Sequence, residues 1–145
     1  MEGYQVVFEH EVLFRDLDAM GHVNSVAFVA LMEDARMQYW KALRTVHGVK
    51  DINFILGEVT CRYLSPAHLG EILLIGIRAC NLGNKSFHFE YSMEDKASGR
   101  LITEGRSVQV MYDYKEQKST PLNDRMRDAV ASLEQLELSN LSAAE

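Results

Sequence analysis

The sequence is poor in the residues that build cross-links, metal centres and membrane spans. Its two cysteines, Cys61 and Cys80, lie far apart and form no CxxC pair, so we expect reduced thiols and a cytoplasmic protein. The five histidines do not cluster beside them, as a structural zinc site of about four ligands would require, so we expect no metal and no cofactor. The longest apolar run, residues 26–32, is far shorter than the roughly 20 residues of a membrane span and belongs in a core.

Positive charge is scarce as well. The chain carries 15 Lys and Arg against 21 Asp and Glu, a formal net charge of −6, and its basic residues are scattered. A nucleic-acid-binding protein usually shows a basic stripe, because neutralised phosphates supply most of its affinity. The composition sets that class aside. The negative net charge also means that an anionic ligand needs a local patch of basic residues, because the electrostatic field of the whole protein repels it.

One long helix dominates the first half of the chain. Residues 25–44 contain good helix formers and no Gly or Pro. Asn24 or Ser25 can cap the start of this helix, and Gly48 lies just beyond its predicted end. Its apolar residues cover more than one stripe, which is typical of a helix that other structure wraps.

Segments with strand character lie on both sides of this helix in the sequence. Residues 4–15 are rich in β-branched and aromatic types, and Phe8, Val12 and Phe14 share one parity, which predicts a strand with one buried face. Residues 16–24 are predicted to form a loop. Four more strands are predicted over residues 57–64, 71–80, 85–94 and 100–112, followed by a short helix over 123–136.

These segments predict a single α+β domain over residues 1–137, with residues 138–145 as a loose C-terminal tail. The length of 145 residues and the hydrophobic fraction of 47% are those of one globular domain. Short turns separate the last four strands, so we expect them to form an antiparallel meander. One extended antiparallel sheet wrapped around the long helix is the natural arrangement.

Three blocks of the sequence carry a specific motif pattern. Residues 14–24 read FRDLDAMGHVN, residues 32–36 read MEDAR and residues 62–67 read RYLSPA. They resemble, in turn, the D-x-D-x-x-G-H-V-N start, the Glu-x-Ala-Arg helix segment and the Y-x-x-P-A turn of the 4-hydroxybenzoyl-CoA thioesterase family. The resemblance covers nearly all of residues 4–115.

The resemblance implies a hot-dog fold and the hydrolysis of an acyl-CoA thioester to a free acid and CoA. It also implies a homodimer or homotetramer with active sites at the subunit interface. In the family the second Asp of the D-x-D block carries catalysis, and that position is Asp18 here. By the same resemblance, the backbone N–H near Ser25 polarises the thioester carbonyl.

Thioester chemistry leaves two routes open for Asp18. The carboxylate can attack the carbonyl carbon directly and form a mixed anhydride. Alternatively, burial or the neighbouring Asp16 raises its pKa, so that it activates a water molecule. Either route benefits from the unpaired N–H groups and the partial positive charge at the start of the long helix.

Five further residues complete the predicted site. His22 either holds the loop or orients substrate or water, and Asn24 caps the helix and can also contact substrate. Phe28 is expected to line an acyl pocket. Lys85, followed by Ser86, is expected to meet the phosphates of CoA from the neighbouring subunit.

Other functions remain open on the residues alone. A non-catalytic acyl-CoA-binding or regulatory protein on the same fold would keep the basic patch without needing Asp18. A hot-dog dehydratase pairs a His with a carboxylate, which His22 and Glu33 could imitate. An acyl-carrier-protein thioester could replace the CoA thioester, and Glu33 is the reserve catalytic carboxylate.

Overall fold

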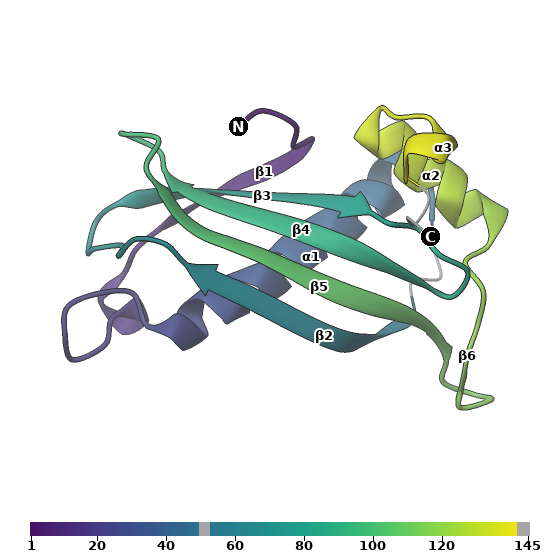
Figure 1. The fold of residues 1–145 in the computed structure, drawn as a ribbon, viewed down its shortest axis with the longest axis horizontal. Coiled ribbons are helices and arrows are strands. Elements are labelled where there is room, and N and C mark those ends of the chain that lie inside the picture. The colour runs from purple at the N-terminus through teal and green to yellow at the C-terminus, as the bar shows by residue number, and fades with distance from the viewer. Residues whose placement is uncertain (50–52, 142–145) are drawn as a thin grey trace.

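A 23-residue helix, α1 (Ser25–His47), crosses one face of an antiparallel sheet in the computed structural model, which describes residues 1–49 and 53–141 (Figure 1). Asn24 is its N-cap, and the Asn24 side chain accepts the Val26 N–H at 2.9 Å. The helix runs three residues beyond the predicted end and stops at Gly48, whose φ of 65° a glycine adopts without strain. In the described ranges, no helix is long and apolar enough to cross a membrane.

The sheet contains every predicted strand, but not in the predicted order. Its long strands are β1 (Val6–Glu11), β2 (Phe54–Tyr63), β3 (Ile72–Cys80), β4 (Ser86–Asp95) and β5 (Leu101–Asp113). They lie in the order β1-β3-β4-β5-β2, and each neighbouring pair is antiparallel. The meander is therefore confirmed only for β3, β4 and β5. The expected neighbour of β3, strand β2, instead pairs with β5 at the far edge.

Three local boundaries differ from the sequence-based expectation. Strand β2 begins three residues earlier than predicted, and a short strand β6 (Lys118–Ser119), which we did not expect, pairs with the end of β5. Strand β1 ends at Glu11, and the chain then turns into a 3-10 helix, η1 (Phe14–Asp16). Phe14 was expected on the buried face of a strand, but it is 82% exposed because that strand has already ended.

The core lies between α1 and the sheet. The inward side chains of β4 alternate with its outward ones, so Phe87 and Phe89 are fully buried. Trp40 of α1 packs against both rings, with centroid distances of 5.9 and 5.4 Å. Strand β5 has Gly105 opposite Met32 of α1, and a Cβ there would lie 2.8 Å from Cε of Met32. Because position 105 has no side chain, Met32 of the helix can pack directly on the backbone of β5.

Two helices close the end of the domain opposite the start of α1 (Figure 1). They are α2 (Asp124–Glu134), which lies within the predicted range, and α3 (Leu138–Leu141). We expected a loose tail from residue 138, but Leu141 is 1% exposed and its carbonyl accepts the Leu82 N–H at 2.6 Å. The first four residues of the expected tail are therefore ordered structure, and residues 142–145 lie outside the described ranges.

A buried carboxylate joins α2 to the core. Glu134 is 6% exposed, and its Oε2 accepts the Tyr39 O–H at 2.6 Å and the Ala79 N–H at 2.9 Å. Burial raises the pKa of Glu134, and these two hydrogen bonds, which lower it, do not cancel the effect of burial. The folded state therefore holds the Glu134 proton more tightly than the unfolded state does.

This shift predicts a pH-dependent stability difference between the wild type and Glu134→Gln. The stabilising contribution of a raised carboxyl pKa is complete below the unfolded value and is lost as the pH rises through the folded value. Glutamine keeps an acceptor for Tyr39 and Ala79 without a titrating group. Urea unfolding should show that Glu134→Gln gains stability relative to wild type as the pH rises from 4 to 7. An equal difference at the two pH values would contradict this account.

Candidate active site

The loop that carries Asp18 is a tight hairpin between β1 and α1. Leu17 and Val23 form an antiparallel bridge, and the Asp18 N–H donates to the His22 carbonyl at 2.8 Å. The hairpin turns at Gly21, whose φ of 80° favours glycine. The loop ends where Asn24 caps α1, so the hairpin sets Asp18 beside the start of the helix.

One oxygen of the Asp18 carboxylate is held and the other is free. Oδ1 accepts the N–H groups of Met20 at 2.8 Å and His22 at 3.3 Å. In the described part of the chain, no group donates to Oδ2. The loop thus fixes the direction of the carboxylate while leaving one oxygen for a ligand or a water molecule.

A cavity of about 400 Å³ opens at this place. It joins the Asp18 loop, the first turn of α1 and the end of β2. Five of the seven predicted site residues line it together: Asp18, His22, Asn24, Ser25 and Phe28. The reserve carboxylate Glu33 is exposed further along α1 and does not line this cavity.

The start of α1 offers a free backbone donor to this cavity. The Asn24 side-chain oxygen accepts a hydrogen bond from the Val26 N–H, and the Asn24 carbonyl accepts one from the Ala27 N–H, both at 2.9 Å. The Ser25 N–H meets no acceptor within residues 1–49 and 53–141. It lies at the positive end of a long helix, where a developing negative charge is stabilised.

The far wall of the cavity comes from a segment that the sequence analysis did not assign to the site. Tyr63 donates its O–H to the Ser25 carbonyl at 3.2 Å, and its ring lies 5.8 Å from that of Phe28. Leu64, Ser65 and Pro66 continue this wall. The RYLSPA block of residues 62–67 contains these wall residues, although the block was interpreted only as a family motif.

The Asp16 side chain forms its hydrogen bonds with residues that precede the Asp18 hairpin. Its Oδ2 accepts the Leu13 N–H at 2.9 Å and lies 2.8 Å from Nε2 of His10 on β1. Burial by itself raises the pKa of Asp16, but these hydrogen bonds outweigh burial and hold the pKa below its usual value. Asp16 is therefore a structural anchor that ties the loop to β1.

Lys85 and Ser86 lie at the end of the sheet that is far from Asp18 in the same subunit. Ser86 pairs with Val110 near the end of β5, whereas Tyr63 beside the cavity pairs with Thr103 near its start. Within one subunit the structure thus separates the expected CoA-binding residues from Asp18 by the length of the sheet (Figure 1).

Metal ligands are not grouped at this cavity or elsewhere in the described ranges. No set of three or more His, Cys, Asp or Glu side chains there has an arrangement that could hold a metal ion.

A long helix wrapped by an antiparallel sheet, with a carboxylate and a free N–H at the start of that helix, defines a hot-dog protein of the thioesterase class. The chain belongs to the thioesterase-like superfamily, whose family model matches residues 12–130. This match confirms both the expected fold class and the resemblance carried by the three sequence blocks.

Known thioesterases are similar over most of their length. A thioesterase from Thermus thermophilus, solved in complex with coenzyme A and Zn, has a TM-score of 0.83 at 30% identity over 94% of this chain and 99% of that chain. Long-chain acyl-CoA thioesterase FadM of Escherichia coli is 26% identical over 122 residues, 81% of this chain and 90% of FadM. The 1,4-dihydroxy-2-naphthoyl-CoA hydrolase of Synechocystis is 22% identical over 131 residues, 88% of this chain and 95% of that protein.

The anchoring role of Asp16 predicts that Asp16→Ala destabilises the fold at neutral pH. Losing an acceptor for the Leu13 N–H and for His10 should cost about 1–3 kcal/mol. Because the folded pKa is depressed, the wild-type advantage should be present above about pH 4 and should shrink as the pH falls through the folded value. Urea unfolding at pH 7 and pH 3 measures both effects. A variant as stable as wild type at pH 7 would rule out the anchor.

Proposed function

We propose that the chain hydrolyses an acyl-CoA thioester to a free acid and CoA, with Asp18 as the catalytic carboxylate. One observation carries the proposal: Asp18, whose Oδ2 has no donor in the described residues, and Ser25, whose N–H has no acceptor there, line one cavity at the start of α1. Hydrolysis of a thioester needs both an oxygen delivered to the carbonyl carbon and a donor for the oxyanion that develops. The two groups can supply these needs at the same carbonyl.

The reaction can begin in either of two ways. Asp18 attacks the carbonyl carbon and expels the CoA thiolate, leaving a mixed anhydride that water then hydrolyses. Alternatively, Asp18 takes a proton from water, and the resulting hydroxide adds to the carbonyl before the thiolate leaves. In both routes the Ser25 N–H donates to the carbonyl oxygen as negative charge builds on it.

The other cavity residues suit positioning of the substrate. Phe28 is 3% exposed and provides an apolar floor for the acyl group. The Asn24 side chain caps α1 through its oxygen, which leaves its amide N–H groups for substrate. His22 stands in the cavity wall beside Asp18 and can orient water or substrate. The names of the two curated relatives state different acyl groups, so the proposal concerns the thioester bond and no particular acyl chain.

A second copy of the chain is needed to bring Lys85 and Ser86 to this cavity. Strand β2 is an edge of the sheet and, in the described residues, pairs only with β5, so its other side is open to another β2. If the two β2 strands pair antiparallel about a two-fold axis, the Tyr63 end of one β2 lies beside the partner's Ile55. Ile55 and Ser86 both pair with Val110, so Lys85 of the partner subunit would lie toward the Asp18 cavity.

The first test replaces the proposed catalytic carboxylate. Asp18→Asn keeps the size of the side chain and an acceptor for Met20 and His22 but removes the charge. In a thiol-release assay on a panel of acyl-CoA thioesters, kcat should fall by roughly 100-fold or more while the protein stays folded.

Asp95→Asn is a matched control for this variant. Asp95 also accepts a backbone N–H in a turn, from Ser98 at 3.1 Å, but it lies outside the cavity. It should leave kcat close to wild type. If Asp18→Asn retains wild-type turnover, Asp18 is not the catalytic group and the proposed mechanism fails.

The shared site is tested by mixing two impaired variants, one with weakened substrate binding and one with slowed turnover. Lys85→Ala should raise KM for acyl-CoA, and Asp18→Asn should lower kcat, in each separate homodimer. In a heterodimer of the two, one site combines an intact Asp18 with the partner's intact Lys85. An equal mixture should therefore recover about a quarter of wild-type activity at low substrate. No recovery, or sedimentation showing a fully active monomer, would place the whole site in one chain.

A further inference from the structure

Two histidine rings meet just outside the cavity. His22, in the cavity wall, and His68, in the segment between β2 and β3, have ring centroids 5.3 Å apart and ring planes at 82°. No hydrogen bond joins the two rings in the described structure, so their contact is an edge-to-face packing and not a proton relay. The contact links the Asp18 hairpin to a different part of the chain.

His68 is held in place by a carboxylate. Its Nδ1 lies 2.8 Å from Oε1 of Glu71, and its backbone N–H donates to the same oxygen at 2.7 Å. The other oxygen of Glu71 accepts Arg100 at 2.8 Å, and Arg100 also donates to the Pro66 carbonyl at 3.1 Å. Two hydrogen bonds to one carboxylate therefore fix both the backbone and the ring of His68.

The charge of Glu71 determines which way these hydrogen bonds run. Burial raises the pKa of Glu71, but the hydrogen bonds from His68 and Arg100 outweigh burial and lower the pKa below its usual value. The carboxylate is thus ionised at neutral pH and only accepts. Nδ1 of His68 must carry the proton, which fixes the ring plane that meets His22.

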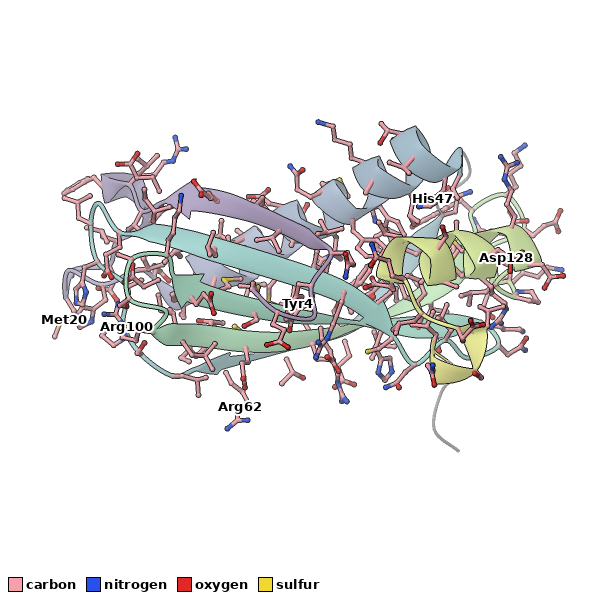
Figure 2. All side chains as sticks on the ribbon, turned by 90° about the horizontal axis from the view of Figure 1, so that it is seen from above. Tyr4, Met20, His47, Arg62, Arg100 and Asp128 are labelled. Atoms are coloured by element: carbon pink, nitrogen blue, oxygen red, sulfur yellow. The ribbon has the colours of Figure 1, made fainter. Side chains whose placement is uncertain are left out.

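The hairpin that carries Asp18 needs support from outside. Asp18, Met20 and His22 are all exposed, and the acceptor contacts of Asp18 come from N–H groups of its own loop. The loop is tied to the segment before β3 by the Val23 N–H, which donates to the Ala67 carbonyl at 2.9 Å. In Figure 2 Arg100 lies at the same end of the molecule as Met20.

His68 is the one aromatic neighbour that the described structure gives His22. Because the His22 N–H donates to Oδ1 of Asp18, a ring that stops His22 from moving also limits the movement of the carboxylate. A series of direct contacts therefore links Arg100 to Glu71, Glu71 to His68 and His68 to His22. The His22 N–H then contacts the Asp18 carboxylate.

We propose that His68, fixed by Glu71 and Arg100, is a positioning residue of the thioesterase site, which holds the His22 ring and through it the Asp18 carboxylate. The inference rests on the proposed function, because it assigns a role toward the same reaction. His68 itself does not line the cavity and touches no reacting atom.

The test compares two replacements of His68 in the whole chain. His68→Ala removes the ring, and kcat per folded molecule should fall about tenfold with KM nearly unchanged, because misplacing a catalytic group costs turnover more than binding. His68→Phe keeps a ring edge for His22 but cannot bond Glu71, so it should recover only part of the lost kcat. His88→Ala, on the outward side of β4, is the matched control and should retain wild-type kcat.

Thermal unfolding and Asp18→Asn, measured in parallel, separate the possible failures. A His68→Ala variant with a lowered melting temperature but wild-type kcat for its folded fraction would overturn the positioning role. His68→Phe as slow as His68→Ala would also overturn it, because the packing of a ring against His22 would then contribute nothing to turnover. If Asp18→Asn keeps wild-type turnover, the proposed function itself fails, whatever His68 does.

Discussion

The start of α1 is the constraint on which the rest of the site depends. Asn24 caps the helix with its side-chain oxygen and its carbonyl, and between them these satisfy the Val26 and Ala27 N–H groups. The Ser25 N–H stays unpaired within the described residues, at the positive end of a 23-residue helix. One buried stripe of α1 packs on the sheet, where Gly105 leaves room for the Met32 side chain. The donor is therefore held in a fixed position before any substrate arrives.

Neighbouring carboxylates serve different purposes because their partners differ. Asp16 accepts hydrogen bonds from Leu13 and His10 through one oxygen and ties the loop to β1. Asp18 uses one oxygen for its own hairpin and keeps the other free toward the cavity. Glu71 holds His68 through direct hydrogen bonds and is itself paired with Arg100. The two acids of the D-x-D block thus have different partners: Asp16 anchors the loop to β1, whereas Asp18 keeps one carboxylate oxygen without a donor in the described residues.

Much of this arrangement could be predicted from local sequence. The helix, its Asn24 cap, its stop at Gly48, and the Asp18 loop follow from capping, glycine conformation and helix propensity, which act over a few residues. Contacts across long sequence distances were missed. Tyr63 and His68 reach the site only because β2 ends beside the start of α1, and the sheet order that places it there depends on pairing with β5.

By itself, the sequence determined the class of fold, the family motifs and the residues of one hairpin at the start of one helix, because those depend on neighbours in the chain. The tertiary structure decided that β2 lies at the sheet edge, that Phe14 is exposed and that residues 138–141 pack as a helix. It also decided that Lys85 and Asp18 lie at opposite ends of one subunit. Such outcomes depend on which surfaces meet after the chain folds back on itself, and no local pattern encodes that choice.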